Sequence, residues 1–125
     1  MKERSSMWHC LLLDLKDDAA LIEEYRRWHR PGAVPSAVVA SIRASGIEQM
    51  EIYQRGDRLV MMMKTGPGFD PAAKAAADAA DPEIVAWETL MSRMQQPLPD
   101  AAPGDKWLPA ERIFALSDQP AVAGE

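Results

Sequence analysis

Hydrophobic residues recur along the chain with two different periods, and the change of period separates expected strands from expected helices. Short apolar or alternating stretches predict strands, because successive side chains of a strand point to opposite faces of a sheet. These stretches are residues 7–15, 47–54, 59–65 and 111–116. Residues 55–58 contain a glycine and join the second stretch to the third, so they predict a hairpin loop.

Apolar residues spaced three and four apart predict helices in the remaining segments. The expected helices are residues 19–29, 36–44, 71–80 and 82–94. Asp70-Pro71 and Asp81-Pro82 each place a capping side chain before a proline, a pattern typical of helix starts. Pro31-Gly32 ends the first helix, and Gly46 follows the second at the position of a C-terminal cap. Residues 97–109 carry four prolines and predict irregular structure.

The main elements follow the order strand, helix, strand, strand, helix, strand. This order predicts an α+β domain of the ferredoxin-like type, with an antiparallel sheet and helices on one of its faces. The run LVMMM at residues 59–63 shows no polar alternation, which indicates that the second face is covered by another copy of the chain. We therefore expect a homodimer of the α/β-barrel type. We expect a flexible N-terminus at residues 1–6, a single domain at 7–116 and a disordered tail at 117–125.

Composition narrows the possible partners. The chain has 125 residues with 47% hydrophobic and 26% charged residues, as expected for one globular domain. A net charge of −5 offers no basic excess for nucleic acid or an anionic membrane. No apolar run is long enough to span a bilayer, and the first residues do not resemble a signal peptide, so we expect a cytoplasmic protein. One cysteine and two histidines exclude an internal disulfide and a structural zinc site built from these residue types alone.

Candidate chemistry is concentrated at the end of the first expected helix. Tyr25 and His29 are four residues apart in the segment EEYRRWHRPG, so a helix places both side chains on one face. An imidazole there could exchange protons near neutral pH, next to a chain break where a pocket could open. Taken alone, such a pair is more often a structural feature at the edge of a core. Trp87 in the last expected helix is likewise compatible with a core role or with a ligand wall.

Several segments together resemble the L-rhamnose mutarotase family, including its L-fucose mutarotase members. They are the short apolar first strand, EEYRRWHRPG, SGIEQMEIYQRGDRLVMMMK, AWETLMSRM and WLPAERIFAL, and they extend from Trp8 to Leu116. The resemblance implies a homodimer of ferredoxin-like subunits that interconverts the α and β anomers of 6-deoxy-L-sugars. It also implies that His29 is the acid/base group, that Tyr25 lies beside it in the sugar pocket and that Trp87 lines the pocket.

Departures from the family pattern lie at positions expected to contact the sugar. Rhamnose-type members carry two adjacent tryptophans, and here Ala86 takes the first place. They also carry a tyrosine in the second strand where this chain has Met50. These differences favour L-fucose over L-rhamnose. Met50, Tyr53 and Trp107 are further expected contacts of the substrate. Trp107 could also anchor the proline-rich segment or close the pocket of a partner subunit.

Mutarotation requires little beyond a positioned acid/base group. The ring oxygen gains a proton while the anomeric hydroxyl loses one, and no metal, nucleotide or other cofactor takes part. The phenol of Tyr25, with an ordinary pKa of about 10, is better suited to hydrogen bonding than to acting as the main base. Two other classes of function remain open from the residues: a non-enzymatic sugar-binding or regulatory dimer, and a cofactor-free oxygenase of similar architecture. The fold alone does not decide among them.

Overall fold

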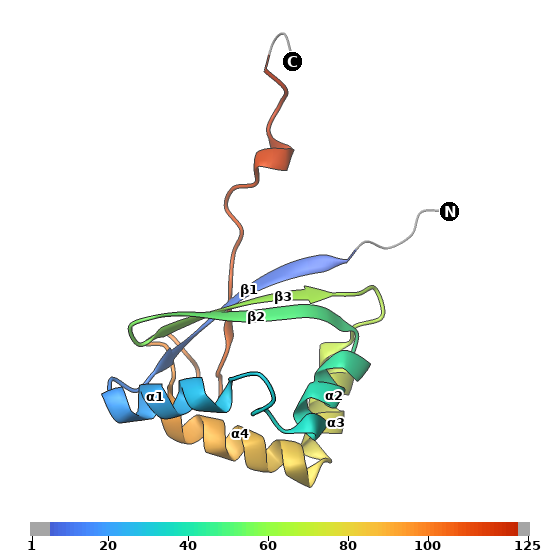
Figure 1. Ribbon diagram of the computed structural model, residues 1–125. Helices are drawn as coiled ribbons and strands as arrows, with labels where there is room; N and C mark the ends of the chain where they lie inside the picture. Colours follow the sequence, from blue (N-terminus) through green and yellow to red (C-terminus); the bar gives the residue numbers. More distant parts are fainter. Residues whose placement is uncertain (1–5, 123–125) are drawn as a thin grey trace.

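The computed structural model describes residues 6–122 and shows a sheet covered on one face by helices (Figure 1). The sheet order is β2-β3-β1-β4, and β5 also pairs with β1. All pairings are antiparallel. The strands are β1 (Met7–Leu15), β2 (Ile47–Arg55), β3 (Arg58–Thr65), β4 (Gln95–Gln96) and β5 (Leu108–Ala110). The helices are α1 (Ala19–Trp28), α2 (Ser36–Ala44), α3 (Pro71–Ala79), α4 (Pro82–Met94) and the 3-10 turn η1 (Leu116–Asp118).

The predicted ferredoxin-like arrangement is confirmed, and three of its four main strands begin and end within one residue of the expected positions. β2 and β3 form the predicted hairpin around Gly56, whose φ of 58° suits a tight two-residue turn. β1 lies at the centre of the sheet between β3 and the edge formed by β4 and β5. Because β1 carries leucines at alternate positions on the helix side, it provides much of the floor of the core.

The fourth predicted strand, residues 111–116, is wrong. The edge beside β1 is instead occupied by two short strands, with Gln95 paired to Leu15 and Ala110 paired to Cys10. Residues 97–107 leave the sheet between them, so the edge strand is interrupted by an excursion. Residues 111–115 therefore have no strand of their own chain to pair with and form no regular structure.

The helix ends follow the local signals in the sequence. The carboxylate of Asp18 accepts hydrogen bonds from two backbone N–H groups at the start of α1, and Asp70 does the same for α3. Asp81 caps α4 through the N–H of Glu83. Gly46 follows α2 with a φ of 97°, a backbone conformation that residues other than glycine rarely adopt. None of the described helices is both long and apolar enough to cross a membrane.

The core lies between the sheet and the two helices α1 and α4. Its fully buried side chains are Leu13, Leu15, Leu59 and Met94. Leu13 and Leu59 are directly opposite each other on β1 and β3, so they pack side by side on the same face of the sheet. α3 buries none of its residues and is an outer layer beside α2 and α4.

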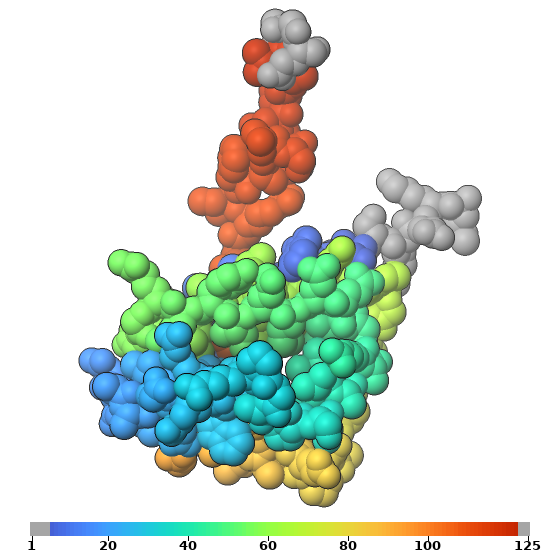
Figure 2. All heavy atoms as spheres, viewed as in Figure 1, coloured from blue at the N-terminus to red at the C-terminus, as the bar shows by residue number. Residues whose placement is uncertain are grey.

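The other face of the sheet has no helix over it (Figure 1). Trp8 and Tyr53 on this face are 50% and 55% exposed. After β5 the chain leaves the sheet as an arm, residues 111–122, which stands clear of the body (Figure 2). Ile113, Phe114 and Leu116 on the arm are between 65% and 93% exposed. Residues 1–5 of the predicted flexible N-terminus and 123–125 of the predicted tail lie outside the described residues.

The core packing predicts a sharp contrast between two methionines. Met94→Ala removes a side chain with no exposed surface and should lower the free energy of unfolding by about 2–5 kcal/mol. Met7→Ala makes the same chemical change at a side chain that is 61% exposed and should cost less than about 0.5 kcal/mol. Urea unfolding followed by circular dichroism measures both, and equal losses for the two variants would contradict this description of the core.

Candidate active site

The end of α1 holds the two side chains on which the site is built. Tyr25 is 4% exposed and His29 is half-buried one turn later, at the residue that caps the helix. Their ring centroids lie 4.2 Å apart with a tilt of 31° between the planes. The chain then turns away through Gly32, whose φ is 84°. This turn leaves the imidazole at the helix end, where the next helix does not cover it.

A single hydrogen bond determines which nitrogen of His29 can act as a base. Nδ1 lies 2.6 Å from the backbone carbonyl oxygen of Tyr25. A carbonyl can only accept, so Nδ1 carries the hydrogen and donates it. In the neutral ring, Nε2 therefore holds the lone pair. Burial lowers the pKa of His29 from its ordinary value near 6.5, and the bond to the Tyr25 carbonyl only partly opposes this effect.

Trp87 from α4 faces the imidazole from another side. Its ring centroid lies 5.6 Å from that of His29, with the planes at 60°. Trp28 packs edge-on against Trp87 at 6.0 Å and donates its indole N–H to Glu24, which Arg93 also contacts. These contacts tie α1 to α4, so the Trp87 ring has little freedom to move.

The hydroxyl of Tyr25 points to the junction of α4 and β4. Gln95 Nε2 donates to Tyr25 Oη over 3.5 Å. Burial raises the pKa of Tyr25 above its ordinary value of 10, and the negative charge of Glu88 adds to this, while the Gln95 hydrogen bond opposes it. Tyr25 is therefore a neutral phenol near pH 7 and can donate a hydrogen bond.

A cavity of about 360 Å³ brings most of the predicted site residues together. Tyr25, His29, Met50, Trp87 and Trp107 all line it. Its other lining residues are Val34, Val38, Val39, Ser41, Ile42, Ile52, Met61, Lys74, Asp78, Ile84, Glu88, Met91 and Gln95. The volume is within the range of about 300–1,000 Å³ typical of small-molecule pockets, and the lining is largely apolar with a few polar groups.

Trp107 reaches the cavity because of the excursion between β4 and β5. Lys106 next to it bonds Glu88 on α4, with Nζ 3.1 Å from the carboxylate and 3.3 Å from the backbone carbonyl. This attachment holds the loop against the helix layer, and Trp107 packs against the core there. In the described chain, Trp107 therefore lines the cavity of its own subunit.

Tyr53 is the predicted site residue that the structure does not bring into this cavity. It lies on the opposite face of the sheet, and its hydroxyl donates to Glu51 over 2.8 Å. It borders a separate hollow at the edge of β2, which Tyr25 and His29 also border. A sugar contact through Tyr53 stays a prediction.

Five polar residues of the cavity were not expected from the sequence: Ser41, Lys74, Asp78, Glu88 and Gln95. Lys74 and Asp78 on α3 form an ion pair of 2.5 Å, and Ser41 on α2 donates to Asp78 over 2.6 Å. The four-residue spacing of Lys74 and Asp78 was a visible signal, although such pairs are common on exposed helix surfaces. Gln95 gave no signal, because its place beside Tyr25 depends on the packing of α4 against the sheet.

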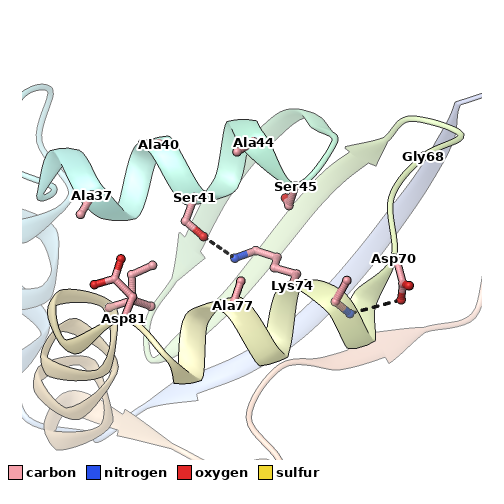
Figure 3. Close-up of a pocket in the computed structure, with 12 residues that line it drawn as sticks. Ala37, Ala40, Ser41, Ala44, Ser45, Gly68, Asp70, Lys74, Ala77 and Asp81 are labelled. Carbon is pink, nitrogen blue, oxygen red and sulfur yellow. Dashed lines mark hydrogen bonds between the residues drawn. The ribbon is translucent and has the colours of Figure 1, made fainter.

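A larger hollow of about 610 Å³ lies between α2 and α3 (Figure 3). Five of its twelve lining residues are alanines, and Lys74 Nζ reaches across it to within 3.4 Å of Ser41 Oγ. It holds no aromatic ring and no imidazole. In residues 6–122, no three His, Cys, Asp or Glu side chains are grouped so that they could bind a metal ion. The acid/base chemistry is therefore concentrated in the smaller cavity.

Comparison with known proteins identifies the family of this chain. The family model described as L-rhamnose mutarotase matches residues 8–116. The chain belongs to the L-rhamnose mutarotase family. It is 59% identical over 113 residues to the L-fucose mutarotase of Xanthomonas campestris pv. campestris. The aligned region covers 90% of this chain and 90% of that protein. The family resemblance inferred from the sequence is thus confirmed.

A solved structure from the same family shows the same fold. The crystal structure of an L-rhamnose mutarotase from Formosa agariphila matches with a TM-score of 0.63 over 88% of this chain and 98% of that chain. The two sequences are 16% identical, so this likeness bears on the fold alone. It agrees with the ferredoxin-like arrangement of the sheet and helices.

The His29 geometry predicts a specific tautomer. Long-range ¹H–¹⁵N spectra of the labelled protein at pH 7 should show His29 protonated at Nδ1 and bare at Nε2. Since burial disfavours the charged ring, its pKa should lie below the 6.5 of an unperturbed histidine, so the ring stays neutral to a lower pH. The imidazole signal that is missing from the spectrum of His29→Gln belongs to His29. The chain unfolded in urea provides the reference value for the His29 pKa. A hydrogen on Nε2, or a pKa at or above 6.5, would be inconsistent with this site.

Proposed function

We propose that this protein is an isomerase that interconverts the α and β anomers of a 6-deoxy-L-hexose, with L-fucose as the first candidate. The observation that carries the proposal is the neutral His29, whose Nδ1 is bound to the Tyr25 carbonyl and whose Nε2 remains available in an apolar cavity. Family membership supports the reaction class. The 59% identity to a protein named L-fucose mutarotase supports the choice of sugar.

The reaction that we propose uses His29 as a proton shuttle. Nε2 removes the proton from the anomeric hydroxyl while the bond between C1 and the ring oxygen breaks. The resulting imidazolium gives that proton to the ring oxygen, so the enzyme returns to its starting state. The free aldehyde rotates, and the ring closes on its other face by the same steps in reverse. The lowered pKa of His29 keeps the base form populated at neutral pH.

The neighbouring side chains hold the sugar for this step. Trp87 can stack on the C–H face and methyl group of a 6-deoxy sugar, because its ring is apolar and fixed by Trp28. The neutral phenol of Tyr25 can donate a hydrogen bond to a sugar oxygen. Met50 and Trp107 complete the apolar wall. The proposed reaction uses only proton transfer between these groups and the sugar, with no cofactor.

NMR saturation transfer between the two anomeric protons tests this function. Micromolar protein added to L-fucose should speed anomer exchange well beyond the rate in buffer, by a factor of about 10² to 10⁴ at the enzyme site. L-Rhamnose measured in parallel tests the choice of sugar. Tyr25→Phe should retain part of the acceleration because it removes a hydrogen bond and leaves the base in place.

Sugar binding without catalysis would give a different result. Trp28, Trp87 and Trp107 lie in or against the cavity, so sugar binding should change the tryptophan fluorescence. Saturable quenching by L-fucose with no faster exchange would identify a binding module in place of a mutarotase. If neither sugar quenched the fluorescence or exchanged its anomers faster, the proposed function would be ruled out.

We also propose that the active form is a homodimer in which the arm, residues 111–122, packs on a second copy. Ile113, Phe114 and Leu116 are exposed on the arm, and the uncovered face of the sheet carries Trp8. An apolar arm and an apolar sheet face on one molecule can cover each other in a symmetric pair. The cytoplasmic location stays a prediction from the sequence.

Analytical ultracentrifugation of arm variants tests the dimer. The wild-type chain should sediment at twice 13.8 kDa at micromolar concentration. Phe114→Asp should raise the dimer dissociation constant at least about tenfold, because it would bury a charge in an apolar contact. Val85→Asp places the same charge on an exposed valine of α4, on the helix side, and should leave the dimer intact. A monomeric wild type, or equal behaviour of the two variants, would exclude this arrangement.

A further inference from the structure

Gln95 is an unusual residue for its position. It lies where α4 ends and β4 begins, its side chain is 7% exposed, and it follows the fully buried Met94. Its Nε2 donates to Tyr25 Oη, while its Oε1 has no hydrogen-bond partner. Among residues 6–122, Gln95 Oε1 is the one buried side-chain polar atom without a hydrogen-bond partner. Turning the amide by 180° would exchange the two atoms and still leave one of them unpaired.

A buried amide with an unpaired atom destabilises a fold, since the group loses its hydrogen bonds to water without replacement. The neighbouring core positions Met91 and Met94 are filled by apolar side chains of similar length. A methionine at position 95 would avoid the unpaired atom. The amide is therefore explained better by a partner that is present only when the cavity is occupied.

The backbone keeps Gln95 at the cavity. Its N–H bonds the carbonyl of Met91 at the end of α4, and the residue is paired with Leu15 in the sheet. The side chain is thus held between helix and sheet, lining the same cavity as His29 and Tyr25. Small rotations of the amide remain possible, but it cannot move out to solvent without breaking the strand pairing.

We propose that Gln95 binds a hydroxyl group of the substrate and so helps to select the sugar. This inference rests on the proposed mutarotase function. Tyr25 Oη accepts from Gln95, which leaves the phenolic hydrogen free to donate to the ligand. A sugar hydroxyl can accept that hydrogen and donate its own to Gln95 Oε1. Only a group that both donates and accepts satisfies the pair, so a hydroxyl fits and a hydrogen or a fluorine does not.

Substitution by methionine separates this role from a structural one. Gln95→Met should melt at the same or a higher temperature than the wild type, since it removes an unpaired polar atom. It should raise the KM for L-fucose about tenfold or more, as expected for a lost hydrogen bond in a buried site, with a much smaller change in kcat. Gln96→Met makes the same change at the exposed neighbour and should alter neither value. An unchanged KM in Gln95→Met, or a lower melting temperature, would overturn the proposal.

A series of L-fucose analogues, each lacking one hydroxyl or carrying fluorine in its place, identifies the contact. Binding is measured by tryptophan fluorescence in the His29→Gln background, so that turnover does not affect it. The penalty of Gln95→Met should disappear for one analogue and persist for the others. Equal penalties for all analogues would overturn the proposal. With L-fucose well below the wild-type KM, a Gln95→Met variant that accelerates anomer exchange as much as the wild type would reject the role of Gln95 alone. Wild-type protein that binds sugar without accelerating exchange would reject only the mutarotase function.

Discussion

The hydrogen bond from His29 Nδ1 to the carbonyl of Tyr25 is the interaction on which the site depends. It uses a backbone acceptor at the end of α1, so no other side chain is needed to orient the imidazole. It also assigns the lone pair to Nε2, which makes the neutral ring a base on the side away from the helix. Burial keeps that neutral form populated by lowering the pKa. Helix geometry thus assigns the lone pair of His29 to Nε2, and burial further favours the neutral ring at neutral pH.

The rest of the fold keeps this helix end at a largely apolar cavity. α4 supplies Trp87 as a fixed wall, and the excursion of residues 97–107 brings Trp107 to the same space. The interrupted edge of the sheet makes this possible, because Gln95 and Leu108 stay paired to β1 while the chain between them is free to fold over the helices. The same interruption releases residues 111–122 as an arm, which is why one feature of the sheet bears on both the site and the proposed dimer.

Local signals in the sequence predicted most of the fold. Asp70 and Asp81 cap helices where expected, because capping involves only neighbouring residues. The strand predicted at 111–116 was wrong because its apolar pattern resembles a strand, whereas the edge beside β1 is occupied by Gln95–Gln96 and Leu108–Ala110. Tyr25, His29 and Trp87 were predicted as site residues from spacing and the family resemblance, and the structure places all three at one cavity. The tautomer of His29 and the position of Gln95 could not be predicted, since both depend on contacts between segments far apart in the chain.

The central claim is that His29 alone transfers the proton that opens the sugar ring. The most direct measurement compares anomer exchange of L-fucose with wild-type protein and with His29→Gln by NMR saturation transfer, after circular dichroism has shown that both are folded. We expect that the variant still binds the sugar, as seen by tryptophan fluorescence, and that its exchange rate falls to that of buffer. A folded His29→Gln protein that accelerates exchange as the wild type does would contradict it.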